Sequence, residues 1–511
     1  MHLPNLFRAS SLRIAIVLGG ILVCGSGALA QADSTDILFA DTSVRGYSLH
    51  FYDDDWKAKM EANWVADSGY VAARFTDGVL TLDSVGVRYK GNSSYSLAGN
   101  SPKKPFKIKF NEFRTQTYYG EKVLNFSNGI GDPSFLREKI SYDIVSRYLP
   151  APRSNFVTLS VDTQAIGLYT QVEQADKSML KRWYADATGN LFKAGDDGAS
   201  LAKLTAAGNP YSDSGYYELK TNETANDWTG FVKFVEFLDG STDSSFCADY
   251  PKFLDAENVT KELAFNMVFS NFDSYTGSGR NYYLYQTSDS GAMHILPWDM
   301  NLSFGGYSNG WDVINQDLLT VGNLADRPLN RRVLSCQPLR YRYLYWVKTM
   351  ILGAASTDSV NAHVARLAPV IRASVAADSN KFYTTAAFET NLTANFRNTS
   401  GVILGLEYFS KARNAKLLAQ VANYLPADYV GIKSSAAVAS GLKVQRQAGQ
   451  FVLSGAVEPL RIELFQTNGH RTGELSLQAG QSATLSSLPR GMIVLRIRTA
   501  TSARTLVLNN L

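Results

Sequence analysis

The chain has 511 residues, of which 45% are hydrophobic and 12% aromatic, and its 50 Lys and Arg residues nearly balance 46 Asp and Glu. This length exceeds a typical single domain, so two or more folding units are expected. The apolar content excludes a disordered or fibrous chain, and a formal charge of +4 gives no support to a nucleic-acid-binding function. Three cysteines are too few for a disulfide scaffold.

The first thirty residues have the composition of a secretory signal peptide. Arg8 and Arg13 precede an apolar run at residues 14–23, and small residues follow up to Ala30. We expect cleavage near Gln31 and a secreted or cell-surface protein. The alternative is a membrane anchor, but about 20 apolar residues are needed to span a bilayer. No later segment has that length, so no transmembrane segment is expected after cleavage.

The segment after the signal peptide is predicted to be rich in strands. Residues 85–90 and 106–110 both alternate between apolar and charged side chains, as expected for two half-buried strands. The charged faces of these two strands carry four cations, Arg88, Lys90, Lys107 and Lys109. Helical spacing at residues 136–149 predicts a helix, and two further strands are expected at residues 156–161 and 168–172.

The rest of the chain divides into a helical part and a strand-rich part. Helices dominate the pattern at residues 228–424, the small residues at 434–440 are typical of a linker, and the last seventy residues alternate strongly. With a hairpin signal at Asn468-Gly469, this last part is expected to be a small β-sandwich.

Several kinds of chemistry are disfavoured by residue type. The five histidines show no zinc-ligand spacing and there is no Cys-x-x-Cys motif, so a histidine-rich metal site is not expected. There is also no Gly-x-Ser-x-Gly turn of the kind that serine hydrolases use. The two cysteines after the signal peptide, Cys247 and Cys336, either pair or remain buried thiols. The acidic and basic residues are left as the candidates for catalysis.

Two basic segments are candidates for binding phosphate. Arg88 leads into a loop of small residues containing Ser93 and Ser94, whose backbone N–H groups and hydroxyls suit an anion. Lys104 and Lys107 enter the return strand, where a lysine would neutralise charge during phosphoryl transfer. The alternatives are a solvated hairpin tip and an edge strand protected by lysines.

Acidic residues supply the other half of a candidate site. Glu138, on the predicted helix, could orient a lysine by an ion pair, or it could belong to a solvated helix face. Asp273 follows a helix, Asn281 comes eight residues later at the head of an aromatic strand, and Asp299 ends a second strand. Oxygen ligands of this kind suit Mg²⁺, which is usually held by few carboxylates together with substrate phosphates. The alternative is that both aspartates are turn and cap residues.

Taken in order, these segments resemble the CotH family of spore-coat-type atypical protein kinases. The resemblance rests on VRYKGNSS at 87–94, KPFKIK at 104–109, LREK at 136–139, GLYTQVEQADK at 167–177, NLFK at 190–193, DSYTGSGRNYY at 273–283 and PWD at 297–299. It implies an α+β, two-lobed kinase-like fold that uses ATP and Mg²⁺ to phosphorylate Ser or Thr of a protein. The lobes would span about 36–176 and 177–424, followed by a linker at 425–441 and the β-sandwich at 442–511.

The resemblance also implies roles for individual residues. Phosphates would be covered by Arg88, Ser93 and Ser94 and contacted by Lys104 or Lys107, with Glu138 as the partner on the helix. The backbone of Glu173 and Gln174 would meet adenine, and Asp176 the ribose. Asp273 would orient or deprotonate the substrate hydroxyl, while Asp299 and Asn281 would hold the metal. Asn301 stands where family members often carry a second acid, which puts a second metal in doubt.

The C-terminal region resembles the sorting domain of the type IX secretion system. The resemblance rests on residues 460–464, Asn468-Gly469, residues 488–491 and residues 494–497, although Ile493 replaces a common aromatic. It implies that type IX machinery exports the protein, and a generic β-sandwich binding module is the alternative. Two rival functions stay open: a non-catalytic surface adhesion or binding protein, and an accessory component of an extracellular polysaccharide-degrading assembly.

Overall fold

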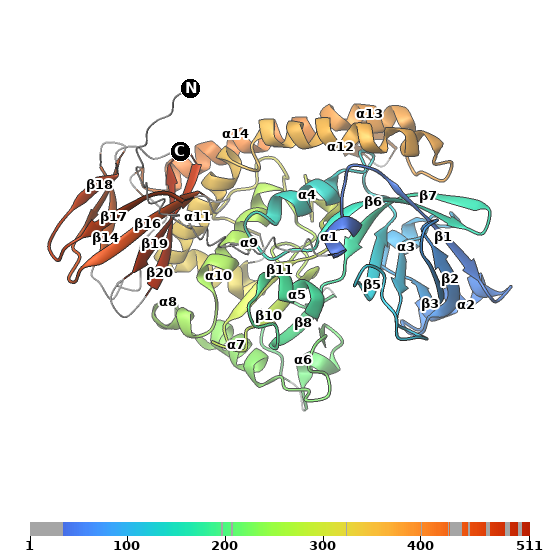
Figure 1. The fold of residues 1–511 in the computed structure, drawn as a ribbon, viewed down its shortest axis with the longest axis horizontal. Coiled ribbons are helices and arrows are strands. Elements are labelled where there is room, and N and C mark those ends of the chain that lie inside the picture. The colour runs from blue at the N-terminus through green and yellow to red at the C-terminus, as the bar shows by residue number, and fades with distance from the viewer. Residues whose placement is uncertain are drawn as a thin grey trace, which may run out of the picture.

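The computed structural model describes residues 34–195, 198–205, 208–322, 324–399, 401–427, 429, 442–447, 450–466, 471–485, 491–498 and 503–510. Its strands and helices confirm the α+β class. A strand-rich part near the N-terminus is followed by a helical body, defined here as residues 177–424, and by two small sheets (Figure 1). In Figure 1 the two small sheets lie at the opposite end of the molecule from the N-terminal strands.

The N-terminal strands close into a seven-stranded barrel in the order β1-β2-β3-β4-β5-β7-β6. Closure depends on a parallel pairing between β1 and β6, which are far apart in sequence. The strands are β1 (Arg45–Phe51), β2 (Val71–Thr76), β3 (Thr81–Tyr89), β4 (Phe106–Lys109), β5 (Val123–Ser127), β6 (Ser154–Val161) and β7 (Gln164–Glu173). Four helices accompany them: α1 (Ser34–Leu38), α2 (Trp56–Val65), α3 (Ser93–Leu97) and α4 (Arg137–Val145).

The alternation of apolar and charged residues in β3 and β4 places apolar side chains inside the barrel and charged side chains outside it. Val87 and Ile108 are fully buried in the barrel core, as expected for the apolar positions of β3 and β4. Arg88 and Lys107 are paired across these two strands and therefore lie together on the outer side of the barrel. The barrel thus carries a positively charged outer face at β3 and β4.

The helical body contains a four-stranded antiparallel sheet in the order β11-β10-β8-β9. Its strands are β8 (Asn190–Ala194), β9 (Tyr217–Leu219), β10 (Tyr282–Gln286) and β11 (Met293–Pro297), with a separate hairpin of β12 (Phe396–Asn398) and β13 (Gly401–Ile403). The helices are α5 (Lys177–Trp183), α6 (Pro210–Asp213), α7 (Thr229–Gly240), α8 (Asp243–Asp249), α9 (Ala256–Val268), α10 (Pro328–Ser335), α11 (Gln337–Leu352), α12 (Thr357–Ala377), α13 (Thr385–Thr393) and α14 (Leu406–Tyr424). Short 3₁₀ turns are η1 (Tyr250–Lys252), η2 (Met300–Leu302) and η3 (Leu324–Asp326).

Helix α4 belongs to the core of this helical body, although it lies in sequence among the barrel strands. Leu136, Ile140 and Ile144, the apolar stripe seen in the sequence, are fully buried in the large core that includes α9 and α11. Helices α12 and α13 run along the top of the barrel hairpin β6–β7 in Figure 1. The barrel and the helical body are therefore joined by α4 and by α12.

The C-terminal residues form two antiparallel sheets that share one apolar core. One sheet contains β14 (Lys443–Gln447), β15 (Gln450–Ser454) and β18 (Ala483–Leu485). The other contains β16 (Leu460–Gln466), β17 (Arg471–Leu477), β19 (Gly491–Arg498) and β20 (Ala503–Asn510). The core contains Leu453 from the first sheet and Ile462 and Leu495 from the second, which is the packing of a β-sandwich. The signal peptide, most of the linker and Asn468-Gly469 lie outside the described residues.

Cys247 and Cys336 are joined by a disulfide, which settles the choice that the sequence left open. The bond connects α8 to the residue between α10 and α11, across a separation of 89 residues. Disulfides persist in oxidising compartments, so this bond fits a protein that acts outside the cytoplasm. Among the described residues, no helix combines the length and the apolar character needed to cross a membrane.

Removing this disulfide is expected to destabilise the helical body. If a disulfide acts by lowering the entropy of the unfolded chain, closing a loop of this length stabilises the folded state by about 4.5 kcal/mol. Removing a native disulfide typically lowers the free energy of unfolding by about 2–5 kcal/mol. The Cys247→Ala/Cys336→Ala variant should therefore unfold at clearly lower urea concentration than the oxidised protein. A reductant should lower the urea concentration at the unfolding midpoint of the wild type and leave the midpoint of the double variant unchanged. Equal midpoints for the two oxidised proteins would contradict this expectation.

Candidate functional site

The β10–β11 hairpin brings two of the predicted metal ligands together. Tyr282 pairs with Pro297 at the end of this hairpin, so Asn281, just before β10, and Asp299, just after β11, lie at the same end. The Asn281 amide donates a hydrogen bond to the backbone oxygen of Asp273 over 2.9 Å. Asp273, Asn281 and Asp299 therefore converge, as the spacing of these residues in the sequence predicted.

Asp273 lies in the turn after α9 and is buried. Its carboxylate accepts a hydrogen bond from Arg280 Nε over 3.0 Å. Burial raises the pKa of Asp299, and the charge of Asp273 adds to this rise.

Asp299 is held in an unusual backbone conformation. Its φ of 55° and ψ of 62° lie in the left-handed region, which costs a non-glycine residue roughly 1–3 kcal/mol. Its backbone N–H donates a hydrogen bond to the Tyr142 hydroxyl on α4 over 3.1 Å. Tyr142 is buried, so α4 fixes the turn that presents the Asp299 carboxylate.

Glu138 comes from the first turn of α4 and is also buried beside Asp299. Burial, followed by the charge of Asp299, raises the pKa of Glu138 to about 8, and Lys90 partly offsets this. The pKa of Asp299 is raised mainly by burial, again with Lys90 as the opposing charge. One Glu138 oxygen, Oε2, has no hydrogen-bond partner among the residues that the structure describes. Two carboxylates that repel each other, one with a free buried oxygen, form a place where a bound cation would be stabilised.

The metal-ligand set at this place is small. Within the described residues, no group of three or more His, Cys, Asp or Glu side chains is arranged to hold a metal. Glu138 and Asp299 supply two carboxylates, and the Asn281 amide oxygen is a third oxygen at the same hairpin end. Such a set suits Mg²⁺, which keeps waters and substrate phosphate oxygens among its ligands.

The outer face of the barrel adds a cluster of cations to this site. Burial, followed by the charges of Lys220, Lys193, Lys90 and Arg88, lowers the pKa of Lys107 to about 7. Lys90 connects this cluster to the acids, because its charge also acts on Glu138 and Asp299. Its ammonium lies 5.8 Å from the ring centre of Trp298. The cations therefore extend from the acidic pair to Lys220.

Lys104 has a different environment. Its ammonium donates hydrogen bonds to the backbone oxygens of Gly99, over 2.5 Å, and Tyr95, over 3.0 Å, and lies 4.1 Å from the Tyr95 ring centre. These contacts tie Lys104 to the loop around α3, the short helix that begins with Ser93 and Ser94. Of the two lysines that the sequence left as candidates, only Lys107 belongs to the cation cluster.

The residues predicted to surround the nucleoside have structural partners. Glu173 is fully buried and pairs with Arg153, over 2.8 Å, and with Arg182. The Asp176 carboxylate caps α5 by accepting from the backbone of Ser178 and Met179. The Gln174 side chain reaches the Tyr283 hydroxyl over 3.4 Å. The Glu173 and Asp176 carboxylates therefore hold the end of β7 and the start of α5 in place.

Five residues of this site were not singled out from the sequence: Tyr142, Arg280, Trp298, Lys193 and Lys220. For Lys193, Arg280 and Trp298 there was a signal, because each lies within one of the segments that carry the family resemblance. Tyr142 had no signal beyond a position in a helix, since its role depends on a turn more than 150 residues away.

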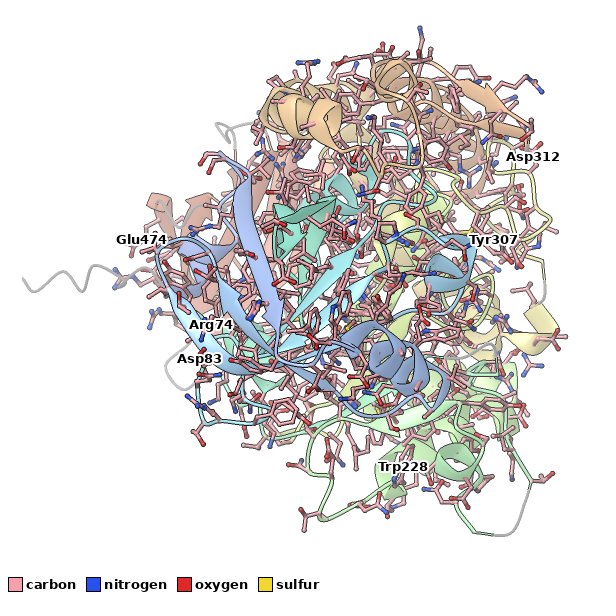
Figure 2. All side chains as sticks on the ribbon, turned by 90° about the vertical axis from the view of Figure 1, so that its right-hand side faces the viewer. Arg74, Asp83, Trp228, Tyr307, Asp312 and Glu474 are labelled. Carbon is pink, nitrogen blue, oxygen red and sulfur yellow. A yellow bond between two sulfur atoms is a disulfide. The ribbon has the colours of Figure 1, made fainter. Side chains whose placement is uncertain are left out.

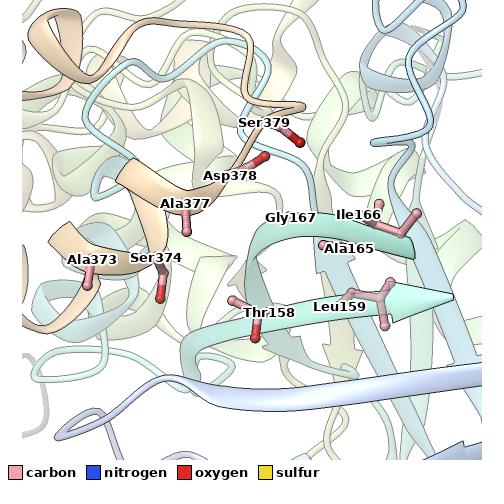
Figure 3. A pocket seen from close by; sticks show the side chains of 10 residues that line it. All are labelled: Thr158, Leu159, Ala165, Ile166, Gly167, Ala373, Ser374, Ala377, Asp378 and Ser379. Atoms are coloured by element: carbon pink, nitrogen blue, oxygen red, sulfur yellow. The ribbon is translucent and has the colours of Figure 1, made fainter. Parts of the chain in front are cut away.

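A separate pocket of about 290 Å³ lies between the β6–β7 hairpin and the end of α12 (Figure 3). Its lining consists mostly of small and apolar side chains, and the Asp378 carboxylate at its edge already accepts from Lys103 and from the backbone of Leu168 and Asn380. No acid of the candidate site lines this pocket. It therefore belongs to the joint between the barrel and α12.

Comparison with known proteins agrees with this geometry. The CotH kinase protein family matches residues 87–415, which include the cationic strands, α4 and the acidic hairpin. The inner spore coat protein H of Bacillus subtilis (strain 168) is 25% identical over 264 residues, covering 51% of this chain and 68% of that protein. Because the family match spans more than half of the sequence, this chain belongs to the CotH kinase protein family.

Proposed function

We propose that this protein is a Mg²⁺-dependent kinase that transfers the γ-phosphoryl group of ATP to Ser or Thr of a protein. The observation that carries the proposal is the convergence of Asp273, Asn281 and Asp299 at one end of the β10–β11 hairpin, next to helix α4. Phosphoryl transfer needs little covalent chemistry from the protein, and it depends on positioning and on charge neutralisation. Family membership supports the same function.

The metal would be held by Asp299, Glu138 and Asn281, whose oxygens fit the ligand preference of Mg²⁺. Bound there, it would neutralise charge on the phosphates during transfer. The buried Glu138 oxygen without a partner supports this assignment. Lys90 and Lys107 would contact the phosphates from the side of the barrel. Arg88 and the Ser93–Ser94 turn would cover the same phosphates.

Asp273 would receive the proton of the acceptor hydroxyl as its oxygen bonds to the γ-phosphorus and the bond to ADP breaks. The Asn281 amide donates a hydrogen bond to the backbone oxygen of Asp273, and Arg280 donates one to the Asp273 carboxylate. These two contacts fix the position of the acid. Adenine would lie along the backbone of Glu173 and Gln174. Because the Asp176 carboxylate already caps α5, we assign it to the support of this segment and not to the ribose.

We further propose that the protein acts outside the cytoplasm and that type IX machinery recognises its C-terminal β-sandwich. The disulfide supports an oxidising compartment. The relative from B. subtilis is described as an inner spore coat protein. Comparing export of the full chain with export of a chain ending at residue 441 would test the sorting role.

Nucleotide-dependent stabilisation tests the kinase proposal against a non-catalytic adhesive protein. A ligand at 100 times its Kd stabilises the folded state by about 2.7 kcal/mol, so ATP with Mg²⁺ should raise the melting temperature measurably. The Asp299→Ala variant should lose the Mg²⁺-dependent part of this rise. Asp54→Asn, which changes an exposed acid in the loop before α2, should keep it. If ATP leaves the wild type unchanged with and without Mg²⁺, the adhesive function is favoured.

A further inference from the structure

Strands β8 and β9 place two lysines on a single glutamate at the edge of the helical body's sheet. Lys193 and Glu218 are paired across these strands, and Lys220 follows β9 directly. The Lys193 ammonium is 2.7 Å from one Glu218 oxygen, and the Lys220 ammonium is 3.1 Å from the other. Each oxygen therefore holds one ammonium, and the group keeps a net positive charge.

A chain of contacts links this sheet to the barrel at Lys107. Asn125, which is paired with Lys107 across β4 and β5, donates a hydrogen bond to the Gln174 side chain. Gln174 in turn donates to the hydroxyl of Tyr283, which is paired with Lys193 across β10 and β8. Of the charges that lower the pKa of Lys107, Lys220 and Lys193 contribute most, ahead of Lys90 and Arg88 on the neighbouring strand. Lys107 lies on β4, whereas Lys193 and Lys220 come from the helical body, so the three ammonium groups converge from opposite walls. Lys107 itself makes no ion pair with any carboxylate in the described part of the chain.

Converging cations of this kind repel one another unless an anion lies between them. The Glu218 carboxylate balances one of the three positive charges. Burial and the neighbouring cations both disfavour the protonated form of Lys107. Lys193 and Lys220 are about two-thirds buried, so their ammonium groups are restrained and still accessible to a ligand. A phosphate group would supply the missing negative charge and three acceptor oxygens.

We infer that Lys193 and Lys220, oriented by Glu218, form a second phosphate-binding subsite that shares Lys107 with the proposed ATP site; where the phosphate is part of the nucleotide, the inference rests on the proposed function. The subsite takes a phosphate group either from the α or β position of a nucleotide or from a phosphate monoester already present on an acceptor. Lys193 and Lys220 are held by Glu218 on β8 and β9, whereas Glu138 lies on α4 and Asp299 follows β11, so the subsite and the metal ligands are built on different elements. Its binding function does not require phosphoryl transfer.

Equilibrium binding without Mg²⁺ tests the subsite apart from the kinase proposal. ADP, adenosine and O-phosphoserine are titrated into the wild type, Lys193→Ala, Lys220→Ala and the double variant in the presence of a chelator. We expect each single variant to weaken phosphate binding about 10-fold and the double variant about 100-fold, because each loses a charge-assisted contact. Lys252→Ala, which removes an exposed lysine paired with Asp249 over 2.6 Å, should leave binding unchanged.

The ligand that responds identifies the source of the phosphate. A loss confined to ADP, with adenosine unaffected, assigns the subsite to the nucleotide, and a loss confined to phosphoserine assigns it to a phosphorylated acceptor. Binding should also weaken as the pH rises from 6.5 to 8.5, because Lys107 loses its proton in this range, and Lys107→Met should flatten this dependence. Unchanged affinities in the double variant, or no binding of ADP and phosphoserine to the wild type, would overturn the inference. Neither result depends on whether the enzyme transfers phosphate.

Discussion

Replacing Asp299 with asparagine is expected to lower phosphoryl transfer by about 10³-fold or more, because charge neutralisation at the phosphates supplies most of the catalysis. The amide keeps the size of the side chain and removes its charge. Transfer of labelled phosphate from ATP to candidate secreted proteins, and to the enzyme itself, measures the effect. Asp54→Asn is the matched control, since it makes the same chemical change at an exposed position.

The same substitution should not destabilise the fold. Burial and neighbouring acids raise the pKa values of Asp299 and Glu138, so the folded protein binds protons that the unfolded chain releases. The stability from these groups is therefore present at low pH and is lost as the pH rises toward 8, the folded pKa of Glu138. Asp299→Asn removes one charge of the pair. We expect its urea midpoint near pH 8 to equal or exceed that of the wild type.

Asp273→Asn separates the two acidic functions. This variant should lose phosphoryl transfer to a similar extent but keep the stabilisation by ATP and Mg²⁺, because Asp273 is assigned to the acceptor hydroxyl and not to the metal. Asp299→Asn should lose both. If both variants transfer phosphate at the wild-type rate, the acidic residues are not the catalytic centre and the kinase proposal fails.

Local patterns in the sequence predicted the elements that carry the site. Alternation placed Arg88 and Lys107 on one side of their strands, and helical spacing predicted α4 with its buried stripe. The spacing of Asp273, Asn281 and Asp299 predicted that they meet, because a hairpin returns to its starting end. These predictions succeeded because each depends on residues close together in the chain.

The parts that could not be predicted depend on distant contacts. Closure of the barrel needs the parallel pairing of β1 with β6, and the lysine pair at Glu218 needs the pairing of β8 with β9. The sequence left the choice between Lys104 and Lys107 open, with Lys104 in the more family-typical position, but the loop around α3 folds back over Lys104. The left-handed turn at Asp299 is bonded to the Tyr142 hydroxyl on α4, and no local signal indicates that contact.

The joint between the barrel and α12 contains the second large expected effect. Lys103, just before β4, forms an ion pair with Asp378 at the end of α12, and the two side chains are 0% and 1% exposed. Asp378 also accepts a hydrogen bond from the backbone of Leu168 on β7 over 2.9 Å. At Gly167, whose φ is 139°, a Cβ atom would come within 2.5 Å of this carboxylate. The joint therefore depends on close approach of the β7 backbone to Asp378.

Asp378→Ala should lower the free energy of unfolding by about 3–5 kcal/mol, because it leaves the Lys103 ammonium buried without its partner. Burial already lowers the pKa of Lys103, and loss of Asp378 lowers it further. The folded variant then releases a proton that the unfolded chain keeps, so its stability should rise as the pH increases toward 10. Urea unfolding at pH 7 and pH 9 should show a smaller deficit at the higher pH.

The exposed ion pair between Arg74 and Asp83 provides the control for this experiment (Figure 2). Its atoms are 2.7 Å apart and its side chains are 50% and 42% exposed, so Asp83→Ala should cost no more than about 1 kcal/mol. Replacing both buried partners, as in Lys103→Met/Asp378→Leu, should restore most of the stability lost by Asp378→Ala, because no unpaired charge remains. A deficit as small as that of Asp83→Ala would show that the buried pair does not hold the barrel against α12. A deficit that the double variant fails to reduce would assign the loss to the hydrogen bonds from the backbone of Leu168 and Asn380, since both contacts are absent in both variants.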